Sequence, residues 1–287
     1  MVAVCVLATT CTLHAQIDFP SLSPEGSVTQ IVGHTTIKVK YERPSARGRV
    51  IYGELVPWDE VWRTGAGWCT KIYFDKPVKV GGAPVAAGAY ALFTIPGKDE
   101  WVVILNTDTT LYGSYDYNSK NDVVRFPAIA HKSNRYYEAL TIDIDFVPNN
   151  ARIYISWVDT QIGFEVETTT DAEVMTFINE ELLTGKCKDA DQYGMGASYY
   201  YYQKVNLNDG LKLVDKMIEA GGNEAWAMRL KMNIHEELHQ YNKALEAIDR
   251  AIELTKESTD YNNVENRQKA IQDWEKEAVR IRRKVEE

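Results

Sequence analysis

The stretch Thr168-Thr169-Thr170-Asp171-Ala172-Glu173-Val174 (residues 168–174) marks a change in the hydrophobic period of the chain. Upstream of it, apolar and polar residues alternate, as in Thr36-Ile37-Lys38-Val39-Lys40-Tyr41, which is the pattern of a half-buried β-strand. Downstream of it, apolar residues recur at the spacing of one helix face, and Thr170 or Asp171 is a suitable N-cap. The first helical stripe consists of Val174, Phe177, Ile178 and Leu182, and it ends at Gly185. We therefore predict two domains, with the boundary inside this stretch.

The first predicted domain, residues 20–168, is rich in short β-type runs that are separated by Gly and Pro. The predicted strands cover residues 36–41, 70–74, 90–95, 101–105, 139–146 and 152–157. No convincing helix lies between them. Many short strands without intervening helices indicate an antiparallel β-sandwich or an open barrel.

The second predicted domain, residues 171–287, is helical, with further helices expected at 191–205, 209–220, 224–238, 241–257 and 262–285. Residues 238–254 resemble the second half of a tetratricopeptide unit, with Ala244 and Ala251 at the small positions where helices cross closely. Residues 211–218 resemble a weaker copy about one 34-residue period upstream. We therefore predict tetratricopeptide-like α-hairpins closed by a C-terminal capping helix.

Residues 1–16 are apolar or small and contain no Lys, Arg, Asp or Glu. They are typical of the apolar region of a secretory signal peptide that is cleaved before Gln16. The basic residues that usually precede such a region are missing, so either the start lies upstream or the signal is truncated. The apolar run is too short to span a bilayer. We expect an exported protein of the periplasm, the outer envelope or the medium, with no integral membrane segment in the mature chain.

The charge of the chain argues against one class of partner. The formal net charge is -9, and the sequence pI is near 5.2. Proteins that bind nucleic acid usually carry a basic surface that neutralises phosphates. We therefore predict no nucleic-acid partner.

His235-Glu236-Glu237-Leu238-His239 has the H-E-x-x-H spacing of a zinc protease helix. The repeat register places His239 at the turn between two helices, where the two imidazoles no longer share a helix face. A charged residue, Glu237, follows the first Glu, and no third ligand follows at a compact spacing. We therefore reject a metal site at His235, Glu236 and His239.

No other catalytic template is present, because the chain lacks a G-x-S-x-G elbow, a P-loop and a dinucleotide fingerprint. We predict no cofactor. Cys69 and Cys187 are the cysteines that lie outside the predicted signal, and the sequence alone does not pair them. The sequence favours a non-catalytic protein and leaves enzymatic activity open.

A dense string runs from residue 43 to residue 58 and reads Arg-Pro-Ser-Ala-Arg-Gly-Arg-Val-Ile-Tyr-Gly-Glu-Leu-Val-Pro-Trp. It continues through residues 61–66 and 87–97. This pattern resembles the family called domain of unknown function 2911, which occurs in exported proteins of Bacteroidetes-type bacteria. The resemblance covers about residues 20–168, and the family includes members with a similar helical tail. It implies export but no established activity.

The resemblance points to Arg43, Arg49, Trp62 and Arg63 as residues that a family-wide function would use. The chain also departs from the family pattern. Family members continue the Trp-Arg-Thr-Gly-Ala string with Asn and a polar residue, whereas this chain has Gly67-Trp68-Cys69. Chemistry that depends on that Asn would be absent here.

The candidate ligand-binding residues are Arg43, Arg49, Trp58, Trp62 and Arg63. Arginines near tryptophans can stack on the indole rings and present a planar fork to a carboxylate or sulfate, as on an anionic glycan or a peptide terminus. In the alternative interpretation, the arginines bond backbone carbonyls and fix loops while the indoles fill the end of the core.

Three hypotheses for function follow. The first is a non-catalytic binding or scaffold protein whose helical tail holds a protein or peptide partner. The second is a carbohydrate- or envelope-binding module that uses exposed Tyr and Trp side chains of the β-domain. The third is a hydrolase with a cleft near Arg49, Trp62 and Arg63.

Overall fold

The computed structural model describes residues 17–259 and 263–286. The predicted signal peptide therefore lies outside the described residues. The chain forms two compact units that are divided between Asp171 and Ala172. We call them the β unit and the helical unit, and each is described by itself.

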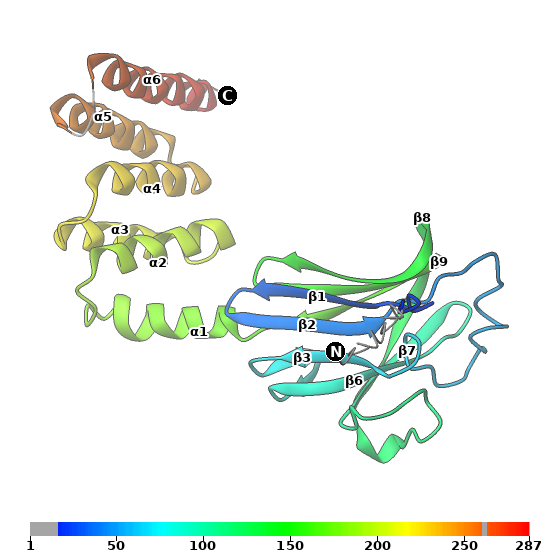
Figure 1. Cartoon of the computed structure of the whole chain (residues 1–287). Coiled ribbons are helices and arrows are strands. Elements are labelled where there is room, and N and C mark those ends of the chain that lie inside the picture. The colour runs from blue at the N-terminus through cyan, green and yellow to red at the C-terminus, as the bar shows by residue number, and fades with distance from the viewer. Residues whose placement is uncertain (1–16, 260–262, 287) are drawn as a thin grey trace, which may run out of the picture. The chain divides into compact units, whose positions relative to one another are not determined.

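The β unit contains a nine-stranded antiparallel sheet in the order β1-β2-β3-β6-β7-β8-β9-β4-β5 (Figure 1). The strands are β1 (Glu25–Val32), β2 (Thr35–Glu42), β3 (Thr70–Phe74), β4 (Val78–Val80), β5 (Ala83–Val85), β6 (Gly88–Ile95), β7 (Glu100–Asn106), β8 (Asp122–Val147) and β9 (Asn150–Glu167). The sheet is open, with β1 and β5 as its edge strands. Strict alternation in β2 buries Ile37 and Val39 and leaves Lys38 and Lys40 exposed, as the sequence pattern predicts.

The long hairpin of β8 and β9 bends the sheet around its core. The first part of β8, residues 122–129, pairs with β7, and the second part, residues 130–147, pairs with β9. The ladder with β9 changes register between Lys132 and Tyr137 and again between Tyr137 and Thr141. Bulges of this kind bend a strand and increase its twist. Apolar side chains from both parts of the sheet therefore meet in one core.

The centre of this core is aromatic. Trp62 stacks on Trp157 with ring centroids 5.9 Å apart and meets Trp101 edge to face at 6.2 Å. Tyr52 packs against all three indoles and also stacks on Trp58 at 5.7 Å. Trp101 and Trp157 are each 1% exposed. Large buried rings contribute much of the apolar area that holds such a core together.

The end of β2 and the segment that follows it cover the free edge of β8. The Tyr41 phenol oxygen accepts a hydrogen bond from the Ile142 N–H at 2.8 Å. The Arg43 Nε donates to the Leu140 carbonyl at 3.0 Å. Ser45 forms an isolated antiparallel bridge with Ala139. Backbone groups that would otherwise stay unpaired at this edge are thereby satisfied.

The helical unit continues from α1, which begins at the boundary between the units. Its elements are α1 (Thr170–Phe177), a π-helical turn (Ile178–Leu182), α2 (Ala190–Gln203), α3 (Leu207–Glu219), α4 (Glu224–Glu237), α5 (Tyr241–Glu257) and α6 (Val264–Glu286). The described helices follow the nine-stranded sheet, so the predicted β + α two-part fold is confirmed. None of the helices among the described residues is long and apolar enough to cross a membrane.

Successive helices of this unit pack on one another, α2 on α3, α4 on α5 and α5 on α6, and α2 also contacts α4. Ala244 and Ala251 on α5 are fully buried, which allows neighbouring helices to approach closely. The stripe predicted on the first helix is wrong at one position. The π-helical turn buries Ile178 and Leu182, but Phe177 is 40% exposed, because it lies to one side of the buried face that Ile178 and Leu182 share.

Candidate ligand-binding groove

The structure places the five candidate residues around the aromatic core and the covered edge of β8. The Arg43 guanidinium donates to Leu140 O and to Thr141 Oγ1, each at 3.0 Å. The Arg49 guanidinium donates to the backbone carbonyls of Ala46 at 3.0 Å and Ser45 at 2.6 Å. Both groups thus hold the chain segment that covers β8.

The remaining three candidates are more enclosed. Trp62 is 7% exposed, and its Nε1 donates to the Gly65 carbonyl at 3.1 Å. Trp58 is half-buried against Tyr52. The Nε of Arg63 is buried and has no hydrogen-bond partner among the described residues. The structure therefore brings Trp58 and Trp62 together through Tyr52, whereas Arg43 and Arg49 bond the backbone instead.

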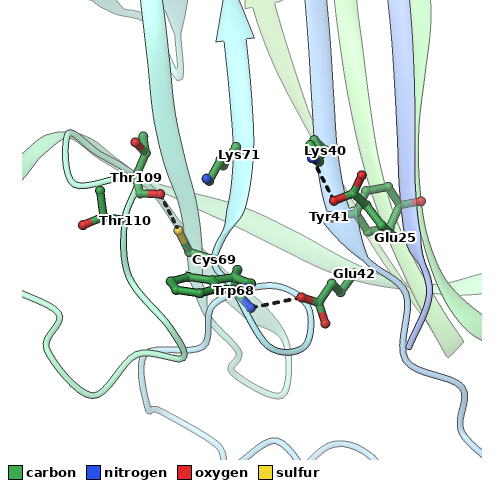
Figure 2. A pocket seen from close by; sticks show the side chains of 9 residues that line it. All are labelled: Glu25, Lys40, Tyr41, Glu42, Trp68, Cys69, Lys71, Thr109 and Thr110. Carbon is green, nitrogen blue, oxygen red and sulfur yellow. Dashed lines mark hydrogen bonds and ion pairs between the residues drawn. The ribbon is translucent and has the colours of Figure 1, made fainter. Parts of the chain in front are cut away.

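A groove of about 480 Å³ lies elsewhere on the β unit, over the outer face of β2 and β3 (Figure 2). None of the five candidate residues lines it. The lining residues are Glu25, Lys40, Tyr41, Glu42, Trp68, Cys69, Lys71, Thr109 and Thr110. The groove thus combines one large indole ring with charged and hydroxyl side chains.

The floor of the groove follows from the register of two strands. Lys40 of β2 and Lys71 of β3 are direct cross-strand partners, so their side chains emerge side by side on one face. Glu25 of β1 pairs with Lys40, with Oε2 and Nζ 2.8 Å apart. Figure 2 shows both lysines above the Trp68 ring, while the Glu42 carboxylate turns toward the Trp68 backbone N–H, which donates to it at 3.3 Å.

One wall of the groove is the loop of residues 107–121, which pairs with the segment after Gly65. The Cys69 N–H donates to Leu111 O at 2.9 Å, and the Gly113 N–H donates to Gly67 O at 2.8 Å. Beneath this wall, Cys69, Phe93, Ile104 and Leu111 belong to a second small core. The pairing brings the Trp68 and Tyr112 rings into an edge-to-face contact with centroids 5.3 Å apart.

Asn106 and Asp122 anchor both ends of the same loop. The Asn106 side chain is fully buried and donates to Asn118 O at 3.1 Å and to Asp122 Oδ1 at 2.8 Å, while its oxygen accepts from the Asp108 N–H at 2.9 Å. Asp122 also accepts from the Tyr117 hydroxyl at 2.6 Å. Burial and this carboxylate raise the pKa of the Tyr117 phenol. The aromatic rim of the groove is therefore held by a satisfied polar network.

Gly67 suits this arrangement. It has φ +54°, and a Cβ at this position would lie 2.5 Å from the Glu42 carboxylate oxygens. Glycine adopts the left-handed backbone without strain, and the missing side chain lets the Glu42 carboxylate lie close to the Gly67 backbone. The positions at which the chain departs from the family pattern, residues 67–69, thus build one end of the groove.

The Cys69 thiol of the groove is not an activated nucleophile. Burial raises the pKa of the Cys69 thiol, and its S–H donates to Thr109 O at 3.5 Å. A protonated, hydrogen-bonded thiol is unreactive, since the thiolate is the nucleophilic form. Cys69 and Cys187 are both free thiols.

The H-E-x-x-H segment forms a helix end. α4 ends at Glu237, and His239 has φ +58° in the following turn. The Glu236 carboxylate accepts from Arg280 Nη2 at 2.7 Å and from Lys284 at 2.8 Å. Over residues 17–259 and 263–286, the structure brings no three His, Cys, Asp or Glu side chains together in a way that could hold a metal ion.

The class of the first unit is thus an open antiparallel β-domain with an outer-face groove. A model of the DUF2911 family, described as proteins of unknown function, matches residues 23–166. The chain belongs to this family, which confirms the resemblance seen in the sequence. The match ends before the helical unit begins. No curated protein and no solved structure matches the chain significantly.

Proposed function

We propose that the chain is a non-catalytic binding protein whose β unit holds a carbohydrate in the groove beside Trp68. One observation carries this proposal, namely the exposure of two paired aromatic rings at the rim of a polar groove. Trp68 is 55% exposed and Tyr112 is 60% exposed. Indole rings are costly to leave in water, and an exposed aromatic ring next to hydrogen-bonding groups is a common feature of ligand sites.

The chemistry of the lining fits a sugar. A sugar ring presents an apolar C–H face and a polar rim, so it requires a flat ring on one side and donors and acceptors around it. Trp68 supplies the flat ring. Lys40, Lys71 and the Thr109 and Thr110 hydroxyls supply polar contacts. A ligand of this kind would bind without any covalent step, in keeping with the protonated Cys69 thiol.

Trp68→Ala is expected to weaken carbohydrate binding by about tenfold or more, or about 1.4 kcal/mol, because the stacking surface is lost. The measurement is isothermal titration of the purified chain with oligosaccharides from plant and bacterial-envelope polysaccharides. Tyr136→Ala is the matched control, since Tyr136 is 59% exposed on β8 and does not line the groove. If no oligosaccharide binds the unmodified chain, or if Trp68→Ala binds equally well, the proposal is wrong.

We further propose that the chain is exported and that its helical unit is a tetratricopeptide-like array that binds a protein partner. α2 and α4 begin at Ala190 and Glu224, and α3 and α5 begin at Leu207 and Tyr241, so each helix recurs after about 34 residues, the tetratricopeptide period. The outer face of α2 carries Met195, 59% exposed, and Tyr202, 79% exposed. Adaptable Met and rigid Tyr side chains are frequent at protein interfaces.

A photoreactive amino acid in place of Tyr202 is expected to form a crosslink to a protein in intact cells of the source organism. Crosslinked and free chain are expected in the envelope or secreted fraction. The same amino acid at Asp273, an exposed position on α6, serves as control. A crosslink of equal yield from both positions would argue against a specific face, and recovery of the chain in the cytoplasmic fraction would contradict export.

A further inference from the structure

The groove contains one cation that no protein group neutralises. Among the described residues, Lys71 forms no ion pair and no hydrogen bond through its ammonium group, although it is half-buried. A lysine that lines a groove can bury its stem and present its ammonium to the groove, where an anionic partner would bind it. The Lys71 ammonium is therefore available to an anionic group of a ligand in the groove.

The other charged groups around the groove are already engaged. Glu25 is bound to Lys40 at 2.8 Å. Glu42 accepts the Trp68 N–H at 3.3 Å. On the opposite wall, the Asp108 carboxylate accepts the Thr110 hydroxyl at 2.7 Å and the Thr110 N–H at 3.0 Å, and these hydrogen bonds lower the pKa of Asp108. No carboxylate of the groove is thus directed at Lys71.

The sheet register places a second cation, Lys40, beside Lys71. Lys71 lies directly opposite Lys40, and like charges at cross-strand positions repel each other. An anion placed over this pair would contact Lys71 and offset the repulsion. Trp68 and Cys69 precede Lys71 by three and two residues, so such an anion would belong to a ligand that already contacts the indole ring.

We infer that the groove selects an acidic sugar, with the ring against Trp68 and the carboxylate of a uronic acid against Lys71. This inference rests on the carbohydrate-binding function proposed above and names its ligand class. The carboxylate would accept a charge-assisted hydrogen bond from the Lys71 ammonium. Lys71 would then be the residue that distinguishes acidic from neutral glycans.

The test compares an oligomer of glucuronic acid with a glucose oligomer of the same linkage and length. Isothermal titration of the full chain is expected to show about threefold to fivefold tighter binding of the acidic oligomer, the upper part of the range for one partly exposed ion pair. Lys71→Met is expected to abolish this preference without changing the affinity for the neutral oligomer by more than about twofold. Lys71→Arg is expected to retain most of the preference, because it keeps the charge.

Lys38→Met is the matched control, since Lys38 is an exposed lysine on the same face of β2 that does not line the groove. Lys38→Met should leave the preference for the acidic oligomer intact. If Lys38→Met and Lys71→Met lose this preference equally, the preference reflects only the net charge of the protein, and the inference is wrong. If both oligomers bind with equal affinity and both lose affinity in Trp68→Ala, the inference about Lys71 is also wrong, but the proposed carbohydrate binding is retained. If neither oligomer nor any other glycan binds, the proposed function itself fails.

Discussion

Trp62→Ala is expected to lower the free energy of unfolding of the β unit by about 3–5 kcal/mol, the range for removing a buried Trp. Trp62 is 7% exposed, stacks on Trp157 at 5.9 Å and meets Trp101 edge to face at 6.2 Å. The substitution leaves a cavity among rings that cannot collapse into it, because strands on both sides hold them. It also removes the donor to Gly65 O. Urea unfolding followed by circular dichroism measures the change.

Trp68→Ala is the natural control for this experiment. It deletes the same side chain, but from a position that is 55% exposed, so the loss of stability should stay below about 1 kcal/mol. Trp62→Ala is thus expected to lower stability, whereas Trp68→Ala is expected to lower the affinity for the ligand. A Trp62→Ala protein that unfolds at the wild-type midpoint but no longer binds its ligand would show that the site lies at the aromatic core instead.

The architecture could be predicted from hydrophobic periods because most elements bury one regular face. The helix predicted at 241–257 is α5, with the same bounds. β1 was not predicted, because its side chains are mostly half-exposed and give a weak alternation. β8 was predicted only over residues 139–146, since its upstream part contains the register shifts that break the period.

The groove could not be predicted, because its parts are distant in sequence. Lys40 and Lys71 become neighbours only through the register of β2 on β3, and no local pattern specifies that register. The wall formed by the loop of residues 107–121 depends on backbone hydrogen bonds between two loops. A usable signal did exist in Gly67-Trp68-Cys69, the departure from the family pattern. We interpreted it as missing chemistry, whereas the structure places Trp68 and Cys69 in the groove lining.

Only arginines are predicted from the sequence as ligand-binding cations, on the basis of their planar fork. In the structure, the guanidinium groups of Arg43 and Arg49 use that fork on backbone carbonyls, where several fixed donors are an advantage. The ammonium of Lys71 has no protein partner within residues 17–259 and 263–286.

Glu236→Gln is expected to destabilise the helical unit at pH 7 by about 1–2 kcal/mol. It is also expected to make the free energy of unfolding of this unit less dependent on pH in the acid range. Hydrogen bonds from Arg280 and Lys284 lower the pKa of Glu236 from 4.5 to about 2, and these three side chains join α4 to α6. A shift of this size corresponds to about 3 kcal/mol at most, at about 1.36 kcal/mol per pKa unit. Arg280 and Lys284 are 45% and 43% exposed, so solvent screening reduces the contribution.

The sign of the pH dependence follows from the lowered pKa. Because the folded carboxyl binds a proton less readily than the unfolded one, its stabilisation is fully present above the unfolded value of 4.5 and is lost as the pH falls through about 2. Urea midpoints of the helical transition between pH 7 and pH 2 should therefore fall more steeply in the wild type than in Glu236→Gln. Glu275→Gln removes an exposed carboxylate from α6 and controls for net charge. Parallel acid profiles for wild type and Glu236→Gln would mean that the ion pairs of Glu236 do not hold α6 in solution. The terminal helix would then depend on its other contacts, among them the packing of Trp274 and Ile281.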